Sequence, residues 1–252
     1  VAVALQPARV GRRIVASVPT ASTPVLPPET VVKEAPDAVA RVLGALKEYS
    51  SVDFSVYRFG TLLRRIHKRM QMARLDDLGR YARYLEESRS ETAALYRDVL
   101  IGVTSFFRDR EAFEALRAAA LPPLIAAAPV RSTLRVWSVG CSTGEEAYSV
   151  AAMLTSELER GERNDLNLKV FATDIDADAL QLAAAGVYPM SAMLDIPPDL
   201  LARYFTKDGD SYRVSEALRR SVIFSRHNIC ANPPFNRIDL ISCRNLLIYF
   251  RP

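Results

Sequence analysis

Apolar residues recur with two different periods along this chain, and the period changes near its middle. In the first half they recur every three or four residues, as Leu62, Ile66 and Met70 do, which is typical of amphipathic helices. In the second half short apolar runs alternate with helix-forming segments, which is typical of an α/β domain. The pattern predicts a small all-helical domain over residues 37–128 and an α/β domain over residues 129–252.

Five helices are expected in the first half, and most carry a recognisable start or stop signal. Asp37, then Asp76 or Asp77, and Ser90 are candidate N-caps, and the pair Pro122-Pro123 is expected to end the last helix. The expected helices cover residues 38–49, 57–73, 77–85, 90–101 and 110–120.

Prolines punctuate residues 1–36, where Ala, Val, Ser and Thr occur without a sustained period. This composition is typical of a linker. The chain begins at Val1 rather than at methionine, so the linker is expected to join an upstream domain. A disordered N-terminal tail is the alternative interpretation.

The second half begins with a strand, a turn and a helix. An apolar run over residues 134–139 stops at small residues, and a helix-forming segment follows over residues 145–158. A second strand is expected over residues 168–173 and a further core strand over residues 237–242, so about three parallel core strands are predicted.

Between those strands a short helix is expected over residues 177–185, with Gly186 as its C-cap. The strand-like stretches 212–214 and 222–224 predict a small β insertion around residues 203–227.

Composition narrows the function classes. The 252 residues carry a net charge of +4, and no apolar run approaches the roughly 20 residues that a membrane span needs. The three cysteines lack CxxC spacing, which argues against a disulfide framework and for a cytoplasmic protein. With two histidines in all, neither a metal site nor a histidine-based triad is expected.

The turn after the first strand indicates a nucleoside ligand. Gly140 and Gly144 enclose three small residues, and glycine lets a backbone turn sharply and approach a ligand closely. Asp174 follows the second strand, where an acid can accept hydrogen bonds from a ribose diol. The alternative for Asp174 is capping of the next helix, although Asp176 is better placed for that role.

Four short stretches stand out when they are taken together: VTSFFRD at 103–109, GCSTGEEAY at 140–148, ATDID at 172–176 and ISCRNLLIYF at 241–250. In this order and spacing they resemble the CheR-type chemotaxis receptor methyltransferases, over about residues 52–250. The resemblance implies a Rossmann-like methyltransferase domain with a helical N-terminal domain and a β insertion. It also implies that S-adenosyl-L-methionine is the cofactor and S-adenosyl-L-homocysteine the product, with methyl esters formed on receptor glutamates during chemotaxis adaptation.

The resemblance also assigns site residues. Asp174 would bind the ribose, Glu145 the methionine amino group, and Thr104 the carboxylate end of the cofactor. Arg108 and Tyr249 would be catalytic residues near the methyl group. The implied cofactor-binding residues are Thr104, Arg108, Glu145, Asp174, Asn228, Ile229, Cys243 and Arg244, with Asn228 and Ile229 at the adenine. Structural alternatives are a helix-dipole acid for Glu145, a surface ion pair for Arg108, a turn residue for Asn228 and a half-buried core residue for Tyr249.

Three expectations concern neighbouring residues. Thr104 and Arg108 are four residues apart, so on a helix they would share a face. Phe106 and Phe107 are expected to be core residues, with a cofactor cage as the alternative. Cys243 is not expected to be a nucleophile, because no partner histidine is evident.

A basic cluster on the helix over residues 57–73 is a candidate substrate-docking surface. Its members are Arg64, Arg65, Lys68 and Arg69, and the expected partner is the acidic helix bundle of a methyl-accepting chemoreceptor. A solvated helix face is the alternative. No nucleic-acid partner is expected, because no base-stacking aromatics interleave the charges.

The chain departs from the family pattern in two places. Gly102 stands where many members have Asn, and members continue past the strand at 239–242 with a helix and closing strands. The domain is therefore expected to be truncated at its C-terminus. The alternative function is a catalytically incomplete module that binds the cofactor or receptor helices as a sensor or scaffold. The sequence of residues 100–109 resembles that of family members in which the methyltransferase follows a CheB-type methylesterase domain. Fused methylesterase or sensor domains are therefore expected partners. No direct membrane insertion is expected.

Overall fold

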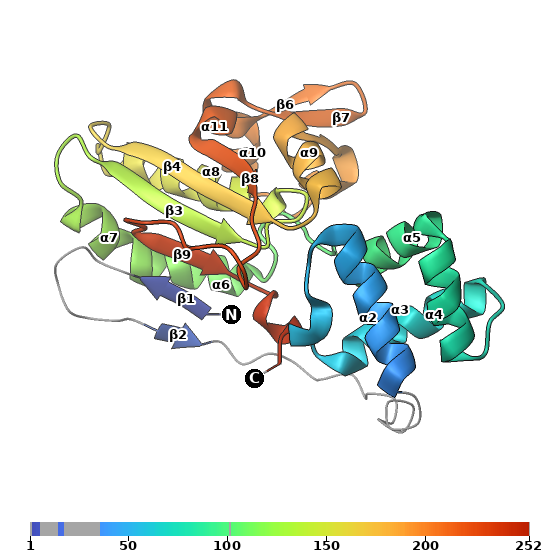
Figure 1. The fold of residues 1–252 in the computed structure, drawn as a ribbon. Helices are drawn as coiled ribbons and strands as arrows, with labels where there is room; N and C mark the ends of the chain where they lie inside the picture. Colours follow the sequence, from blue (N-terminus) through green and yellow to red (C-terminus); the bar gives the residue numbers. More distant parts are fainter. Residues whose placement is uncertain (1, 6–14, 18–35, 101, 252) are drawn as a thin grey trace. The chain divides into compact units, whose positions relative to one another are not determined.

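A computed structural model describes residues 2–5, 15–17, 36–100 and 102–251 (Figure 1). They fall into two compact units. The α/β unit comprises Val1–Thr20 and Gly102–Leu246, and the helical unit comprises Ala21–Ile101 and Leu247–Pro252. The division after the helices falls at residue 102 rather than near residue 128, because apolar residues between 106 and 121 belong to the core of the α/β unit.

In the part of the chain that the structure describes, the helical unit packs four helices around an apolar core. They are α2 (Pro36–Ser50), α3 (Phe59–Met72), α4 (Leu78–Glu87) and α5 (Arg89–Val99), with short 3-10 turns η1 (Phe54–Val56) and η4 (Leu247–Tyr249). The face predicted for α3 is confirmed, since Leu62, Leu63, Ile66 and Met70 are buried. Asp77 caps α4 as expected, whereas α5 is capped by Ser88 rather than by Ser90, because the Ser88 hydroxyl accepts from Glu91 N.

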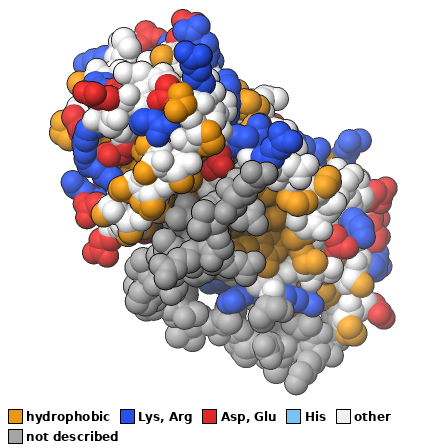
Figure 2. Space-filling view, turned by 90° about the vertical axis from the view of Figure 1, so that its left-hand side faces the viewer, with side chains coloured by type: hydrophobic (Ala, Val, Ile, Leu, Met, Phe, Trp, Pro, Cys, Tyr) orange, Lys and Arg blue, Asp and Glu red, His pale blue; other side chains and the backbone are white. Residues whose placement is uncertain are grey.

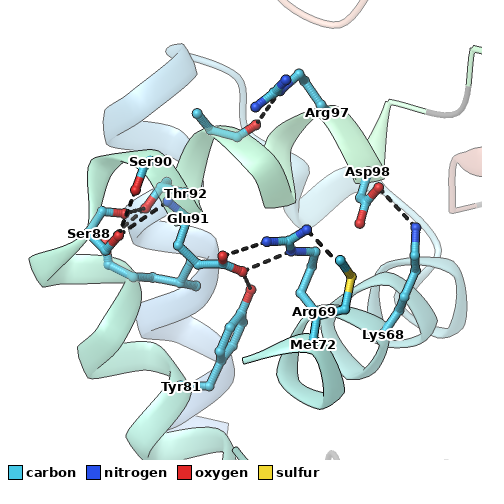
Figure 3. A network of polar contacts seen from close by, with 12 residues as sticks. Lys68, Arg69, Met72, Tyr81, Ser88, Ser90, Glu91, Thr92, Arg97 and Asp98 are labelled. Carbon is cyan, nitrogen blue, oxygen red and sulfur yellow. Dashed lines mark hydrogen bonds and ion pairs between the residues drawn. The ribbon is translucent and has the colours of Figure 1, made fainter. Parts of the chain in front are cut away.

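A polar network joins three of these helices (Figure 3). The Glu91 carboxylate on α5 accepts two hydrogen bonds from Arg69 on α3, at 2.9 and 2.5 Å, and one from Tyr81 Oη on α4 at 2.9 Å. Only 8% of the Glu91 side chain and 16% of the Arg69 side chain are exposed. Burial and the hydrogen bond to Glu91 raise the pKa of Tyr81, so its hydroxyl remains a donor.

Among the described residues, the α/β unit is built on a six-stranded sheet in the order β2-β1-β9-β3-β4-β8. Its parallel strands are β3 (Thr133–Val139), β4 (Asn167–Asp174), β8 (Val222–Arg226) and β9 (Leu240–Cys243). The sequence predicted three of these four and assigned β8 to the β insertion. That assignment is wrong, because residues 222–226 pair with residues 170–174 of β4.

The antiparallel strands β1 (Ala2–Leu5) and β2 (Val15–Ser17) extend the sheet beyond β9. Both fall within residues 1–36, which composition predicted to be a linker. Pro36 begins α2, and the other residues of that segment lie outside the described part of the chain, so the linker stays a prediction.

Strand register assigns each side chain to one face of the sheet. Val136 pairs with Val170 and Leu240, and all three are buried in one core cluster with α8 (Glu145–Arg160). Trp137 pairs with Phe171 and Ile241 and belongs to a second cluster. The sheet therefore buries both faces of β3, as a central parallel strand does.

The remaining helices of this unit are α6 (Arg110–Ala115), the π-helical turn η2 (Leu116–Ala120), α7 (Leu121–Ala127), α9 (Ala177–Ala185), α10 (Pro198–Tyr204) and α11 (Glu216–Ser221). Phe113, Leu116 and Leu121 share a core cluster with β3 and α8, so residues 110–127 belong to the α/β unit. Pro122 and Pro123 do not end the helical stretch. They occupy the first turn of α7, where proline's missing N–H costs no hydrogen bond.

A small antiparallel sheet in the order β5-β7-β6 forms a subdomain of the α/β unit. Its strands are β5 (Val187–Pro189), β6 (Phe205–Asp208) and β7 (Ser211–Val214), and η3 (Met190–Met193) follows β5. The insertion thus begins before residue 203 and ends before β8. Gly186, with φ +62°, caps α9 as expected and turns the chain into β5.

Charges of both signs share the surface. On the face drawn in Figure 2, Lys and Arg side chains are interspersed with Asp and Glu, in keeping with the net charge of +4. Within the described residues, none of the helices combines the length and apolar character needed to cross a bilayer.

The Arg69–Glu91 pair is expected to stabilise the helical unit. Glu91→Gln keeps an acceptor for Tyr81 but leaves the charge of Arg69 without its partner, so we expect a loss of about 1–3 kcal/mol in the free energy of unfolding. Denaturant unfolding measures the change. Glu86→Gln is the matched control: Glu86 forms a similar bidentate pair with Arg41, but that pair is exposed and its loss should matter little. Equal effects of the two substitutions would contradict the prediction.

Candidate active site

The carboxyl ends of the parallel strands meet at one edge of the sheet. Val139 is level with Thr173, Thr173 with Ser225, and Ser138 with Ser242. The chain leaves β3 toward β4 on one side, whereas β9 lies on the other side of β3. The strand order thus reverses at β3, and open α/β sheets bind ligands at the carboxyl ends of their strands at such a reversal.

The turn after β3 is fixed to the second strand. Gly140 N and Cys141 N both donate to the Thr173 carbonyl oxygen, at 2.8 and 3.0 Å. Gly140, Ser142 and Gly144 have φ values of +71°, +48° and +94°. A Cβ atom on Gly144 would lie 2.8 Å from Ala183 Cβ, so both the backbone angle and the space require glycine there.

Asp174 joins this turn to the end of β4. One carboxylate oxygen accepts from Ser142 N at 2.7 Å and the other from Asp176 N at 3.0 Å. Asp176, not Asp174, caps α9, as the sequence suggested. Burial raises the pKa of Asp174. Each carboxylate oxygen has a second lone pair, so the group can still accept from a diol.

Glu145 is the first residue of α8 and is only 9% exposed. Thr143 Oγ1 donates to its carboxylate at 2.6 Å, and burial raises its pKa. The neighbouring Glu146 is also desolvated, which raises its pKa despite the nearby Arg244. Two carboxylates in the first turn of a helix disfavour a phosphate ligand and favour a cationic one.

The segment carrying Thr104 and Arg108 is not helical, so the expectation that they share a helix face is wrong. Phe107 and Asp109 have φ values of +48° and +56°, which a helix does not allow. The side chains of Phe106 and Phe107 are 0% and 7% exposed, which confirms them as core residues. Phe107 N donates to Ser149 Oγ on α8 at 3.0 Å, and Arg108 Nη1 donates to the Val103 carbonyl at 2.7 Å.

Arg244 lies just after β9 and is almost completely buried. Its guanidinium contacts Asp109 at 3.0 Å and Glu146 at 3.5 Å, and it donates to the Arg108 carbonyl oxygen. Its carbon Cζ lies 4.8 Å from the centre of the Phe113 ring. These contacts give Arg244 a structural role, and its direct contact with the cofactor stays a prediction.

Asn228 and Ile229 lie in the loop after β8, at the same edge of the sheet. Asn228 Oδ1 accepts from Cys230 N at 2.9 Å, which makes it a turn residue, while its side-chain NH₂ group can donate to a ligand. Ile229 is 37% exposed and offers an apolar surface. The pair combines the donor and the apolar contact that an adenine ring can use.

Cys243 ends β9 at this edge. Burial raises its pKa to about 11, so near neutral pH it is a thiol and a weak nucleophile. The expectation that it is not a nucleophile agrees with this shift.

Two groups of predicted site residues belong to the helical unit. The carbonyl oxygen of Tyr249 accepts from Arg58 N at 2.7 Å. In the basic cluster on α3, Arg64 and Lys68 are exposed and Arg65 is half-buried, whereas Arg69 is held in the pair with Glu91. Arg69 is thus engaged within the protein, and its spacing of three from Ile66 and seven from Leu62 is the signal that places it beside the buried face.

Sequence reasoning missed two residues at the turn. Glu146 pairs with Arg244 and accepts from Ser242 Oγ at 2.7 Å, and its only signal is a second acid after Gly144. Tyr188 donates to the Thr143 carbonyl at 2.7 Å from a strand that the sequence did not predict.

A glycine-rich turn after the first parallel strand and a half-buried acid at the end of the second define a Rossmann-like nucleoside-binding domain. Family comparison makes the class specific. The family described as CheR methyltransferase, SAM binding domain, matches residues 102–252, and the one described as CheR methyltransferase, all-alpha domain, matches residues 37–100. The chain belongs to the CheR methyltransferase family. The boundary between the two matches agrees with the division between the two units.

Similar proteins come from several bacteria. An uncharacterised 104.1 kDa protein of Rhodobacter capsulatus is 43% identical over 219 residues, which cover 87% of this chain and 23% of that protein. A chemotaxis protein methyltransferase of Listeria monocytogenes is 32% identical over 81% of this chain and 76% of its own length. One from Borreliella burgdorferi is 29% identical over 85% of this chain and 78% of its own length. The chain thus spans less than a quarter of the first relative.

The site residues fit S-adenosylmethionine. Asp174 offers acceptors to a ribose diol, and Glu145 offers a desolvated carboxylate to an ammonium group. Ile229 and the amide of Asn228 suit an adenine ring. Both carboxylates depend on the turn between Gly140 and Gly144, because Asp174 accepts from Ser142 N and Glu145 directly follows Gly144.

Glu145 is expected to make cofactor binding pH-dependent. Burial raises its pKa in the free protein, and pairing with an ammonium group would lower it again, so binding favours loss of its proton. The affinity for S-adenosylhomocysteine should therefore fall as the pH is lowered from neutral toward about 5. Calorimetry over this range measures the slope.

In the Glu145→Gln variant, the affinity should be lower at neutral pH and should vary less with pH. Glu157→Gln is the control, since Glu157 lies near the other end of α8 and pairs with Arg117 and Arg160. A pH slope that survives unchanged in Glu145→Gln would remove Glu145 from the ammonium site.

Proposed function

We propose that this chain transfers the methyl group of S-adenosylmethionine to glutamate side chains on the helices of chemoreceptors, giving methyl esters. The observation that carries the proposal is the pair of carboxylates at the glycine-rich turn of a CheR-family domain: the half-buried Asp174, which is hydrogen-bonded to the turn, and the buried Glu145, which follows it. Relatives named chemotaxis protein methyltransferase support the choice of acceptor. The same names support a role in chemotaxis adaptation. The cytoplasmic location is part of our proposal and is supported by the three cysteines, which lack CxxC spacing.

The chemistry asks little of a general base. The cofactor supplies an activated methyl group on a positively charged sulfur. A glutamate carboxylate, with an ordinary pKa of about 4.3, is already ionised near neutral pH. The protein's contribution is therefore to align the acceptor oxygen and to exclude water from it. A site without a histidine or a reactive thiol is sufficient for this reaction.

Arg108 is the residue that we assign to orienting the acceptor. Its backbone is fixed between Phe107 and Asp109, both in the left-handed region, and Arg244 binds its carbonyl oxygen. Its guanidinium donates through Nη1 to the Val103 carbonyl oxygen, and its other N–H groups can donate a forked pair of hydrogen bonds to a carboxylate. Thr104 and Tyr249 are assigned, respectively, to the carboxylate end of the cofactor and to the surroundings of the methyl group. Cys243 and Arg244 complete the proposed cofactor site.

The ester product gives a direct test of the proposal. Purified chain, methyl-labelled cofactor and a chemoreceptor signalling domain should give protein-bound label that mild alkali releases as methanol. Label stable to alkali would overturn the assignment to a carboxyl group. Receptor binding without any labelling would support the alternative of a cofactor- or receptor-binding module. The Asp174→Ala variant is the control for dependence on the proposed site. It should label the receptor at least tenfold less, because it loses two hydrogen bonds to the ribose.

The basic cluster on α3 is our proposed docking surface for the acidic receptor helices, and its accessible members are Arg64, Arg65 and Lys68. Lys68 also contacts Asp98 at 3.2 Å, in a pair whose lysine side chain is 53% exposed. Long-range attraction between such charges raises association rates and weakens with salt.

Reversal of these three charges to Glu should lower the rate of receptor methylation by roughly tenfold or more at low salt, because steering is lost. Affinity for S-adenosylhomocysteine should stay unchanged. Reversal of Arg80 and Arg83, which are exposed on α4 of the same unit, is the matched control. If both sets of variants methylate the receptor equally well, α3 is not the docking surface.

We also propose that domains of this kind act within larger proteins that carry methylesterase or sensor domains. The Rhodobacter capsulatus relative supports this idea, since the matched region is 23% of its length.

A further inference from the structure

Tyr188 belongs to the small sheet, yet its hydroxyl reaches the glycine-rich turn. Tyr188 Oη donates to the Thr143 carbonyl oxygen at 2.7 Å, across 45 positions of sequence. Along β5 the side chains of Val187 and Pro189 are exposed, while that of Tyr188 is 4% exposed. The alternation of a strand therefore turns this one side chain of β5 inward.

The hydrogen bond between Tyr188 and Thr143 lies next to Gly144, where the turn has no space for a side chain. The Thr143 carbonyl belongs to the peptide that leads into Gly144, whose φ is +94°. A Cβ atom on Gly144 would lie 3.0 Å from Tyr188 Oη. The next residue is Glu145, whose carboxylate accepts from the Thr143 hydroxyl. Tyr188 thus fixes the Thr143–Gly144 peptide, which immediately precedes Glu145.

The ring of Tyr188 also contacts the segment that carries Arg108. It meets Phe106 edge-on, with ring centroids 4.9 Å apart and an interplanar angle of 80°. Phe106 is fully buried and lies two residues before Arg108. Tyr148 on α8 lies on another side, with centroids 6.2 Å apart. One side chain therefore touches both the turn and the Arg108 segment.

We propose that Tyr188 is a positioning residue for cofactor binding, which sets the turn so that Glu145 and the Ser142 N–H bound to Asp174 are in place before the cofactor arrives. This inference rests on the proposed placement of the cofactor at the turn. Burial raises the pKa of Tyr188, so its hydroxyl remains a donor throughout the working pH range. A site whose geometry is fixed in advance loses less freedom on binding.

The test compares two tyrosine-to-phenylalanine variants. Tyr188→Phe removes the bond to the turn, and Tyr204→Phe removes the hydroxyl of another buried tyrosine, which contacts Glu159 on α8 at 3.5 Å, away from the turn. The affinity for S-adenosylhomocysteine, measured by calorimetry, should fall about three- to tenfold in Tyr188→Phe and stay unchanged in Tyr204→Phe. Equal affinities in all three proteins would overturn the proposal, as would losses that merely follow the melting temperature.

A second readout requires no cofactor. Amide hydrogen exchange over residues 141–148 should be faster in Tyr188→Phe than in the original chain or in Tyr204→Phe, because the turn is less restrained. Unchanged exchange would overturn the proposal. A third outcome separates this inference from the proposed cofactor site: the original chain binds no S-adenosylhomocysteine, yet exchange still rises in Tyr188→Phe. The proposed cofactor placement would then fail, and the positioning role with it. The restraint of Tyr188 on the turn would stand.

Discussion

The α/β unit depends on a buried guanidinium at the carboxyl end of its sheet. Arg244 joins the end of β9, the first turn of α8 through Glu146, and the strained segment around Arg108 through Asp109 and a carbonyl oxygen. A buried charge is tolerated only when partners surround it, and each of these partners comes from a different part of the chain. The two left-handed residues beside Arg108 can persist because this clamp and Ser149 hold them in place.

Desolvated carboxylates give the same edge of the sheet its chemical character. Burial raises the pKa of Asp174, Glu145 and Glu146, and of these Glu146 has an arginine partner in Arg244. Asp174 and Glu145 instead receive hydrogen bonds from backbone or hydroxyl groups. A ligand that brings a positive charge and a diol would satisfy both, which explains why this turn suits S-adenosylmethionine better than a phosphorylated dinucleotide.

The two units differ in how far local pattern predicts them. In the helical unit, the face of α3 and the cap of α4 follow from residues a few positions apart. In the α/β unit, β8 was assigned to the insertion and β5 was missed, because both are short strands whose partners lie far away in sequence. Helix 110–127 was assigned to the wrong unit, since its apolar face does not reveal which surface it will cover.

The sequence by itself determined the family, the strand–turn–helix at Gly140 and the acids Asp174 and Glu145, because these are signals of residue type at short spacing. Only the tertiary structure decided that Arg69 pairs with Glu91, that Arg244 holds the Arg108 segment and that Tyr188 reaches Thr143. These contacts join residues 22 to 136 positions apart. Such pairs form only after the chain has folded, because burial and strand order bring them together and no local periodicity records them.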